Sequence, residues 1–316
     1  MITAALPRVA ARFTFGLLLT AAAVLIAPAV SLAAGSLPLS TTFKGQAKFD
    51  ALVKRAEKEN WRALPIGDRT IAVGLALVGT PYVNYTLEID DHIEAPSVNL
   101  TGLDCWTFYE SSLAFSRMLQ VYQPPYRPEM MLKMIELERY RGGKCTGVYT
   151  SRLHHLEDLY QDNRQRGLMD DLSKPLGGVR IYRNVTEMQN AWKSYRYLRN
   201  NPDLRPAMAR IEDHVTNLAV YHIPKGRVAS IEPQLRNGDI ISITSAEDGG
   251  YTSHVGLIYK DRAGVARFVH ASSKSGVRSV TIGPAISSYL ALSSSRAGIL
   301  VGRPKDIAAP QYVDRK

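Results

Sequence analysis

The stretch GLDCWTFYESSLAFSRML, residues 102–119, decides how the chain is expected to fold. Four residues recur at helical spacing and form one stripe, namely Phe108, Ser112, Phe115 and Leu119. Asp104 stands where the N-cap of that helix belongs, so Cys105 would be its first residue. The positive end of the helix dipole favours thiolate over thiol, and we therefore expect a sulfur that is nucleophilic near neutral pH.

The last third of the chain contains three β-rich runs separated by turn residues: DIISITS at 239–245, SHVGLIYK at 253–260 and VARFVHASS at 265–273. These runs predict an antiparallel sheet. His254 and His270 lie on neighbouring predicted strands, so their side chains could line up on one face. A cysteine nucleophile needs a proton carrier and usually an orienting third group, which these histidines could supply.

The region before the sheet has mainly helical patterns. Residues 44–62 and 70–78 predict helices, the second of which ends at Gly79-Thr80-Pro81. The segment from about 120 to 225 is charged, aromatic and mainly helical by pattern. Because helices come first and strands last, the sequence predicts an α+β fold.

Composition limits the possible classes of protein. The chain has 316 residues, of which 45% are hydrophobic, and this is enough for a sizeable core. Two cysteines cannot form a disulfide framework or a four-cysteine zinc site. The net charge of +10 favours anionic partners.

The first residues have the order of a secretory signal. Arg8 and Arg12 precede an apolar run over 13–30, and the small residues at 31–34 suit cleavage after Ala33 or Ala34. An uncleaved membrane anchor is the alternative, which the run is barely long enough to allow. Cleavage would lower the net charge from +10 to +8 by removing both arginines. We expect an exported protein with no stable membrane anchor and no nucleic-acid partner.

Three segments carry a resemblance to a known superfamily. GTPY at 79–82, DCWTFYE at 104–110, and NGDIIS followed by SHVGLI within 237–258 resemble the NlpC/P60 superfamily of papain-like cysteine hydrolases, in family order. YTSRLHH at 149–155 and the closing VHASS are most similar to its N-acetylmuramoyl-L-alanine amidase-like (DUF1460) subfamily. The resemblance covers roughly residues 70 to 300.

This resemblance implies a papain-like α+β fold with the nucleophile at a helix N-terminus, packed on an antiparallel sheet. Residues 1–33 would be the signal peptide and 34–316 a single catalytic domain with a long, mainly helical insertion at about 120–225. Cys105 would be the nucleophile, His254 the general base and His270 its orienting partner. The backbone N–H of Cys105 and the hydroxyl of Tyr82 would stabilise the oxyanion.

Other residues leave alternatives open. Tyr149 and Arg152, with His154, could bind a substrate carboxylate, or the segment could be a solvated helix start. No zinc-binding ligand pattern occurs, so we expect neither metal nor cofactor. Cys145 is expected to be a free thiol.

The resemblance implies an exported cysteine amidase that hydrolyses the N-acetylmuramoyl-L-alanine bond of peptidoglycan or muropeptides through a thioester. A stem-peptide endopeptidase of the same superfamily is the first alternative. A non-catalytic wall-binding protein is the second, and a lipid acyltransferase is more remote. The sequence predicts no oligomeric state.

Overall fold

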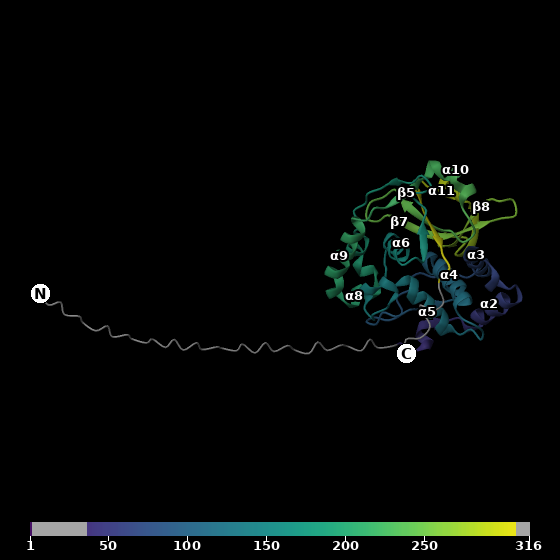
Figure 1. Cartoon of the computed structure of the whole chain (residues 1–316), viewed down its shortest axis with the longest axis horizontal. Coiled ribbons are helices and arrows are strands. Elements are labelled where there is room, and N and C mark those ends of the chain that lie inside the picture. Colours follow the sequence, from purple (N-terminus) through teal and green to yellow (C-terminus); the bar gives the residue numbers. More distant parts are fainter. Residues whose placement is uncertain (2–36, 308–316) are drawn as a thin grey trace. The chain divides into compact units, whose positions relative to one another are not determined.

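The main feature of the fold is a single large sheet. The computed structural model describes Met1 and residues 37–307, and those from 37 onward belong to one structural unit. Its eight-stranded sheet has the order β4-β5-β10-β6-β7-β8-β9, with β3 also paired to β10; Figure 1 labels β5, β7 and β8 of this sheet. Neighbouring strands are antiparallel, which confirms the predicted α+β class.

The strands of this sheet are β3 (Met169–Asp171), β4 (Val179–Arg180), β5 (Tyr221–Pro224), β6 (Ile240–Ser245), β7 (Thr252–Lys260), β8 (Ala266–Ser272), β9 (Ser279–Ala285) and β10 (Arg296–Pro304). A separate parallel pair joins β1 (Phe43–Lys44) to β2 (Val98–Asn99). Strands β6, β7 and β8 coincide with the three predicted β-rich runs. They could be predicted because each is long enough to show a strand pattern in the sequence.

The helices are α1 (Leu39–Thr42), α2 (Gln46–Lys58), α3 (Ile66–Ala76), α4 (Cys105–Val121), α5 (Pro128–Arg139), α6 (Leu156–Gln165), α7 (Glu187–Asn190), α8 (Arg196–Asn200), α9 (Arg205–Thr216), α10 (Val228–Ile231) and α11 (Ile286–Ala291). Short 3-10 helices are η1 (Trp61–Ala63), η2 (Arg141–Gly143), η3 (Tyr149–Ser151), η4 (Trp192–Ser194), η5 (Pro202–Leu204), η6 (Lys225–Arg227) and η7 (Glu232–Gln234). Helix α3 begins at Ile66, before the predicted Thr70, and directly after the N-cap residue Pro65.

The two faces of the sheet carry different parts of the core. Val255 and Leu257 of β7 belong to the cluster that contains α3 and α4, whereas Ile258 and Phe268 pack with α10 and α11 on the other side. This division follows from the alternation of side chains along a strand. Helix α4 is buried almost all round, so its N-terminus has a fixed position against the sheet.

The segment predicted as a mainly helical insertion is more mixed than expected. It supplies α5 to α9, of which α8 and α9 lie together at one side of the unit (Figure 1). It also supplies β3, β4 and β5, which extend the sheet through β10 and β5. The prediction missed these strands because they are too short to show a period of two.

The predicted signal peptide falls on residues that, apart from Met1, lie outside the described part of the chain. Within residues 37–307, no helix has both the length and the apolar character that a bilayer crossing requires.

Candidate active site

Cys105 is the first residue of α4, as the sequence predicts. The carboxylate of Asp104 accepts a hydrogen bond from the Thr107 backbone N–H at 2.8 Å, and the Thr107 hydroxyl accepts one from the Asp104 backbone N–H at 3.0 Å. This reciprocal cap satisfies two backbone donors at the helix start. Asp104 is therefore a capping residue, and it fixes where the following sulfur lies.

Opposing effects act on the pKa of the Cys105 thiol. Burial, followed by the nearby charge of Asp104, raises the pKa of the thiol to about 12, although backbone N–H groups of Val255, Trp106 and Cys105 itself oppose this shift. The expectation of a thiolate near neutral pH is therefore wrong for this structure. Loss of water around the sulfur outweighs the favourable helix N-terminus.

His254 and His270 form a hydrogen-bonded pair on β7 and β8. The Nε2 atom of His254 lies 2.8 Å from the Nδ1 atom of His270. Burial lowers the pKa of His254 to about 3, with His270 and Arg296 contributing, and it lowers the pKa of His270 to about 4. Both rings are consequently neutral at pH 7, and the hydrogen bond leaves the Nδ1 atom of His254 for another partner.

The strand that carries His254 also reaches the Cys105 sulfur, through its backbone. The N–H that acts on the Cys105 thiol belongs to Val255, the residue directly after His254. The histidine rings themselves contact Tyr289 of α11, whose ring centroid lies 5.0 Å from that of His270 and 6.2 Å from that of His254. Tyr289 thus holds the pair in place, a role that no sequence motif indicated.

A cavity of about 360 Å³ opens beside Cys105. Its lining includes the three residues predicted for substrate or oxyanion binding, Tyr82, Tyr149 and Arg152. The Tyr82 backbone N–H donates to the Arg278 carbonyl at 2.9 Å, and burial raises the pKa of its phenol to about 12. The phenol is therefore protonated at neutral pH and can donate a hydrogen bond.

Tyr149 and Arg152 form another wall of this cavity. Arg152 is 3% exposed, so the alternative of a solvated helix start is wrong, and α6 begins only at Leu156. The Arg152 guanidinium lies over the Tyr149 ring at 4.6 Å. Its nitrogens are 3.7 Å from a carboxylate oxygen of Glu88 and 3.7 Å from one of Glu94.

Glu88 and Glu94 are residues that sequence reasoning missed. The Tyr149 hydroxyl donates to Glu88 at 2.6 Å, and the Tyr140 hydroxyl donates to Glu94 at 2.6 Å. Both acids lie far upstream of Arg152 and outside every motif, so only the folded chain brings them together. They compensate the charge of a buried arginine, which would otherwise be costly.

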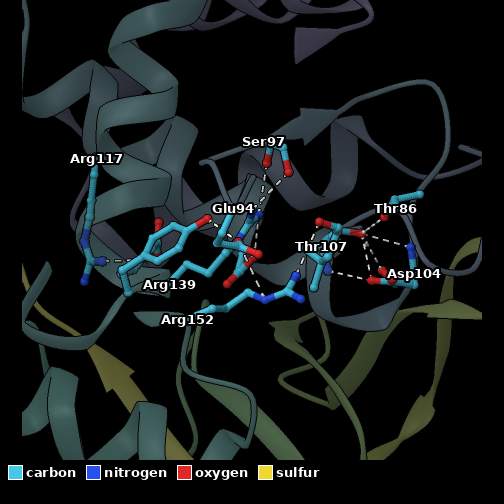
Figure 2. Close-up of polar contacts among 12 residues, drawn as sticks. Thr86, Glu94, Ser97, Asp104, Thr107, Arg117, Arg139 and Arg152 are labelled. Carbon is cyan, nitrogen blue, oxygen red and sulfur yellow. Dashed lines mark hydrogen bonds and ion pairs between the residues drawn. The ribbon is translucent and has the colours of Figure 1, made fainter. Parts of the chain in front are cut away.

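A second buried arginine connects this wall to α4. Arg139 of α5 forms an ion pair with Glu110 of α4 at 2.8 Å and donates to the Ser97 carbonyl at 3.0 Å. Figure 2 shows Arg139, Ser97, Glu94 and Arg152 in one view with Asp104 and Thr107 of the α4 cap. The helix that carries Cys105 is thus joined by charged groups to the segment that carries Glu94.

Two further features concern sulfur and metals. Cys105 and Cys145 are both free thiols, and the Cys145 sulfur donates to the Glu94 carbonyl at 3.4 Å. Among residues 37–307, no three His, Cys, Asp or Glu side chains come together as a metal site would require.

Comparison with known proteins identifies the family of the chain. The model of the AmiA-like family, described as N-acetylmuramoyl-L-alanine amidase-like, matches residues 72–295. A solved N-acetylmuramoyl-L-alanine amidase from Bacteroides uniformis ATCC 8492 is similar with a TM-score of 0.69 and 27% identity, over 76% of this chain and 99% of that one.

Two other solved structures are also similar. A Bacteroides fragilis protein provisionally named a xylanase has a TM-score of 0.65 and 32% identity, over 73% of this chain and 99% of its own. A Legionella pneumophila protein with 19% identity shares the fold, with a TM-score of 0.59 over 84% of this chain and 97% of its own. No curated protein sequence matches the chain.

Proposed function

The chain belongs to the AmiA-like, N-acetylmuramoyl-L-alanine amidase-like family, and from that premise we propose that it is an exported cysteine amidase of peptidoglycan or muropeptides. The bond cleaved is the amide between N-acetylmuramic acid and L-alanine, and the fold is the papain-like fold of the NlpC/P60 superfamily. One observation carries the proposal: Cys105 lines a cavity at a helix N-terminus, and the strand whose Val255 N–H acts on its thiol also carries His254, which is paired with His270.

The first half of the reaction forms a thioester. The Cys105 sulfur attacks the lactyl carbonyl carbon while His254 takes the thiol proton. The resulting oxyanion accepts hydrogen bonds from the backbone N–H of Cys105 and the hydroxyl of Tyr82. When the C–N bond breaks, His254 gives its proton to the leaving amine of L-alanine.

The second half releases the acid. Water attacks the thioester carbon and loses a proton to His254, which passes it to the sulfur as the C–S bond breaks. The products are the regenerated Cys105 thiol and the lactyl carboxylic acid of N-acetylmuramic acid, which then ionises in water. His270 positions His254 throughout, and the neutral state of both rings leaves His254 able to accept the proton at each step.

Glycoside hydrolysis, the chemistry named for the Bacteroides fragilis relative, finds less support in this cavity. Such enzymes use two carboxyl groups that face each other across the substrate. Asp104 is occupied by the helix cap, and Glu88 accepts hydrogen bonds from Tyr149 and from the Tyr197 backbone. Asp104 and Glu88 thus already have structural partners, and so does the third acid of the lining, Glu187, which accepts a hydrogen bond from the Tyr195 hydroxyl at 3.0 Å.

Mass spectrometry of digested muropeptides tests the proposed bond. An amidase releases intact stem peptides that begin with L-alanine and leaves sugars with a free lactyl carboxylate. Surviving muramyl dipeptide with shortened stem peptides would instead identify the endopeptidase alternative. Cys105→Ala should abolish hydrolysis, whereas Cys145→Ala, the matched control, should retain it; an active Cys105→Ala variant would refute the mechanism.

Export and domain organisation belong to the same proposal. Residues 1–33 act as a cleaved signal peptide, and 34–316 form one catalytic domain with the insertion at about 120–225. Sequencing the N-terminus of the protein from the periplasm or culture medium should find a start at Ala34 or Gly35. A chain that keeps Met1 in that fraction would contradict cleavage.

A further inference from the structure

We infer that Tyr85 is a stacking platform for the sugar ring of the substrate, so that the N-acetylmuramoyl group lies over residues 82–85 and the stem peptide extends toward 149–155. The inference rests on the proposed function and adds to it the orientation of the substrate and a residue that recognises the glycan. The observations concern the backbone of Tyr85, its attachment to α4 and the distribution of charge in the cavity.

Tyr85 combines an exposed ring with an unfavourable backbone conformation. It lines the cavity of Cys105, its side chain is 65% exposed, and its φ is 59°. Residues other than glycine rarely adopt this left-handed backbone conformation, because their Cβ atom crowds the backbone. A packed ring could compensate this cost, but an exposed ring does not, and such strain tends to occur at functional sites.

The turn that carries Tyr85 is attached to the start of α4. The Thr86 hydroxyl donates to the Thr107 hydroxyl at 3.4 Å, and Thr107 is the residue that caps α4 together with Asp104 (Figure 2). The Val83 backbone N–H donates to the Leu103 carbonyl at 3.1 Å. These bonds on both sides of Tyr85 fix its position relative to Cys105.

The lining residues of the cavity differ in charge. Tyr82, Asn84 and Tyr85 carry no charge, and Asp104 beside them is held in the helix cap. The other charged or titratable lining residues are Glu88, Arg152, His154, His155 and Glu187. In the intact substrate the lactyl carboxyl is part of the amide, so the sugar is uncharged. The uncharged sugar suits the lining formed by Tyr82, Asn84 and Tyr85, which leaves the lining around 149–155, with its polar groups, to the backbone amides of the stem peptide.

Aromatic faces suit a sugar because the C–H groups on one side of a pyranose ring form a flat apolar surface. The exposed amide of Asn84 can form hydrogen bonds with the acetamido group beside it. The sugar stays attached to Cys105 after the amine leaves, so the contact with Tyr85 persists in the thioester. Stacking would therefore contribute to binding rather than to one chemical step.

Two synthetic substrates separate this role from a structural one. The first is N-acetylmuramoyl-L-alanyl-D-isoglutamine, and the second replaces the sugar by an O-methyl group on the same lactyl unit. We expect Tyr85→Ala to lower kcat/KM for the sugar-bearing substrate roughly three- to tenfold, mainly through KM. It should leave kcat/KM for the sugar-free substrate unchanged.

The variants Tyr85→Trp and Tyr85→Phe should retain wild-type kcat/KM, because each keeps an aromatic face. Tyr182→Ala is the matched control, since Tyr182 is 67% exposed and does not line this cavity. Tyr85→Gly should match Tyr85→Ala in activity while keeping or raising the melting temperature, because glycine tolerates the backbone conformation.

Equal losses on both substrates, or no loss on either, would overturn the inference. This outcome differs from failure of the proposed function, in which Cys105→Ala remains active or the products do not begin with L-alanine. An amidase that depends on Cys105 but is indifferent to Tyr85 would keep the function and discard the platform.

Discussion

Cys105 and His254 rest as a neutral thiol and a neutral imidazole. Burial raises the pKa of the first and lowers the pKa of the second, because a charge on either group would be poorly solvated. A preformed thiolate–imidazolium pair is therefore disfavoured before substrate binds. Proton transfer to His254 has to accompany attack on the carbonyl, and this makes the neutral ring a requirement for the proposed reaction.

The pH dependence of activity follows from these values. Since His254 and His270 have pKa values of about 3 and 4, the coupled pair loses its base form only below about pH 4. We expect kcat/KM for muramyl dipeptide to stay nearly constant from pH 5 to 8 and to fall below pH 4.5. An acid limb near pH 6.5, the value for a solvated imidazole, would contradict the buried pair.

Asp104 acts on Cys105 in a second way, through its charge. Asparagine caps helices about as well as aspartate, so Asp104→Asn should keep stability and lower the pKa of the Cys105 thiol by removing a nearby negative charge. Asp104→Ala should lose the cap and about 1 kcal/mol of unfolding free energy. Thiolate absorbance at 240 nm and urea denaturation measure the two effects, and an unchanged thiol pKa in Asp104→Asn would refute the first.

At the scale of elements, β7 and β8 hold the histidine pair because Gly256 lets them approach. A Cβ atom at Gly256 would lie 2.5 Å from the Val269 carbonyl oxygen and 2.7 Å from the Phe268 ring. The Phe268 ring in turn stacks on His270, with centroids 4.8 Å apart. Packing between these two strands thus requires glycine at this position of the SHVGLI segment.

Gly256→Ala should consequently damage both stability and activity. Overpacking against backbone that cannot move costs about 1–3 kcal/mol, and displacement of Phe268 would disturb His270. Gly226→Ala is the control, because a Cβ atom there meets nothing within 4 Å. Urea denaturation and muropeptide hydrolysis would compare the two variants, and a Gly256→Ala protein with wild-type stability would contradict the steric argument.

At the scale of the whole molecule, the sequence predicts what a single element or motif contains. The helix at Cys105 and strands β6 to β8 carry their periods within themselves, and the proposed nucleophile and histidines lie in recognisable segments. The strands β3 to β5 escaped prediction because two to four residues show no period. Glu88 and Glu94 are the partners of Arg152. They could not be predicted, because only tertiary contacts bring them to that arginine.

The high pKa of Cys105 could not be predicted for the same reason. A helix N-terminus is visible in the sequence, but the burial of the sulfur that opposes it depends on how the folded chain packs around the start of α4. Position along the chain gives the sign of the dipole effect. The folded environment decides whether desolvation of the sulfur outweighs that dipole effect.

The buried ion pair of Arg139 and Glu110 tests how this environment is maintained. Its side chains are 1% and 0% exposed, and the pair links α5 to the helix of Cys105. Arg139→Met leaves the Glu110 carboxylate buried without its cation, so unfolding free energy should fall by about 3–5 kcal/mol. Lys305→Ala, which breaks an exposed pair 3.4 Å apart, should cost at most about 1 kcal/mol.

The double variant Glu110→Leu with Arg139→Met distinguishes stability from positioning. Replacing both charges by apolar groups removes the uncompensated carboxylate, so urea denaturation should show most of the lost stability restored. If the pair also positions α4, hydrolysis should stay below wild type despite this recovery, because Arg139 no longer ties Glu110 to Ser97. Full activity in the double variant would limit the pair to a structural role and leave the cap at Asp104 as the main device that places Cys105.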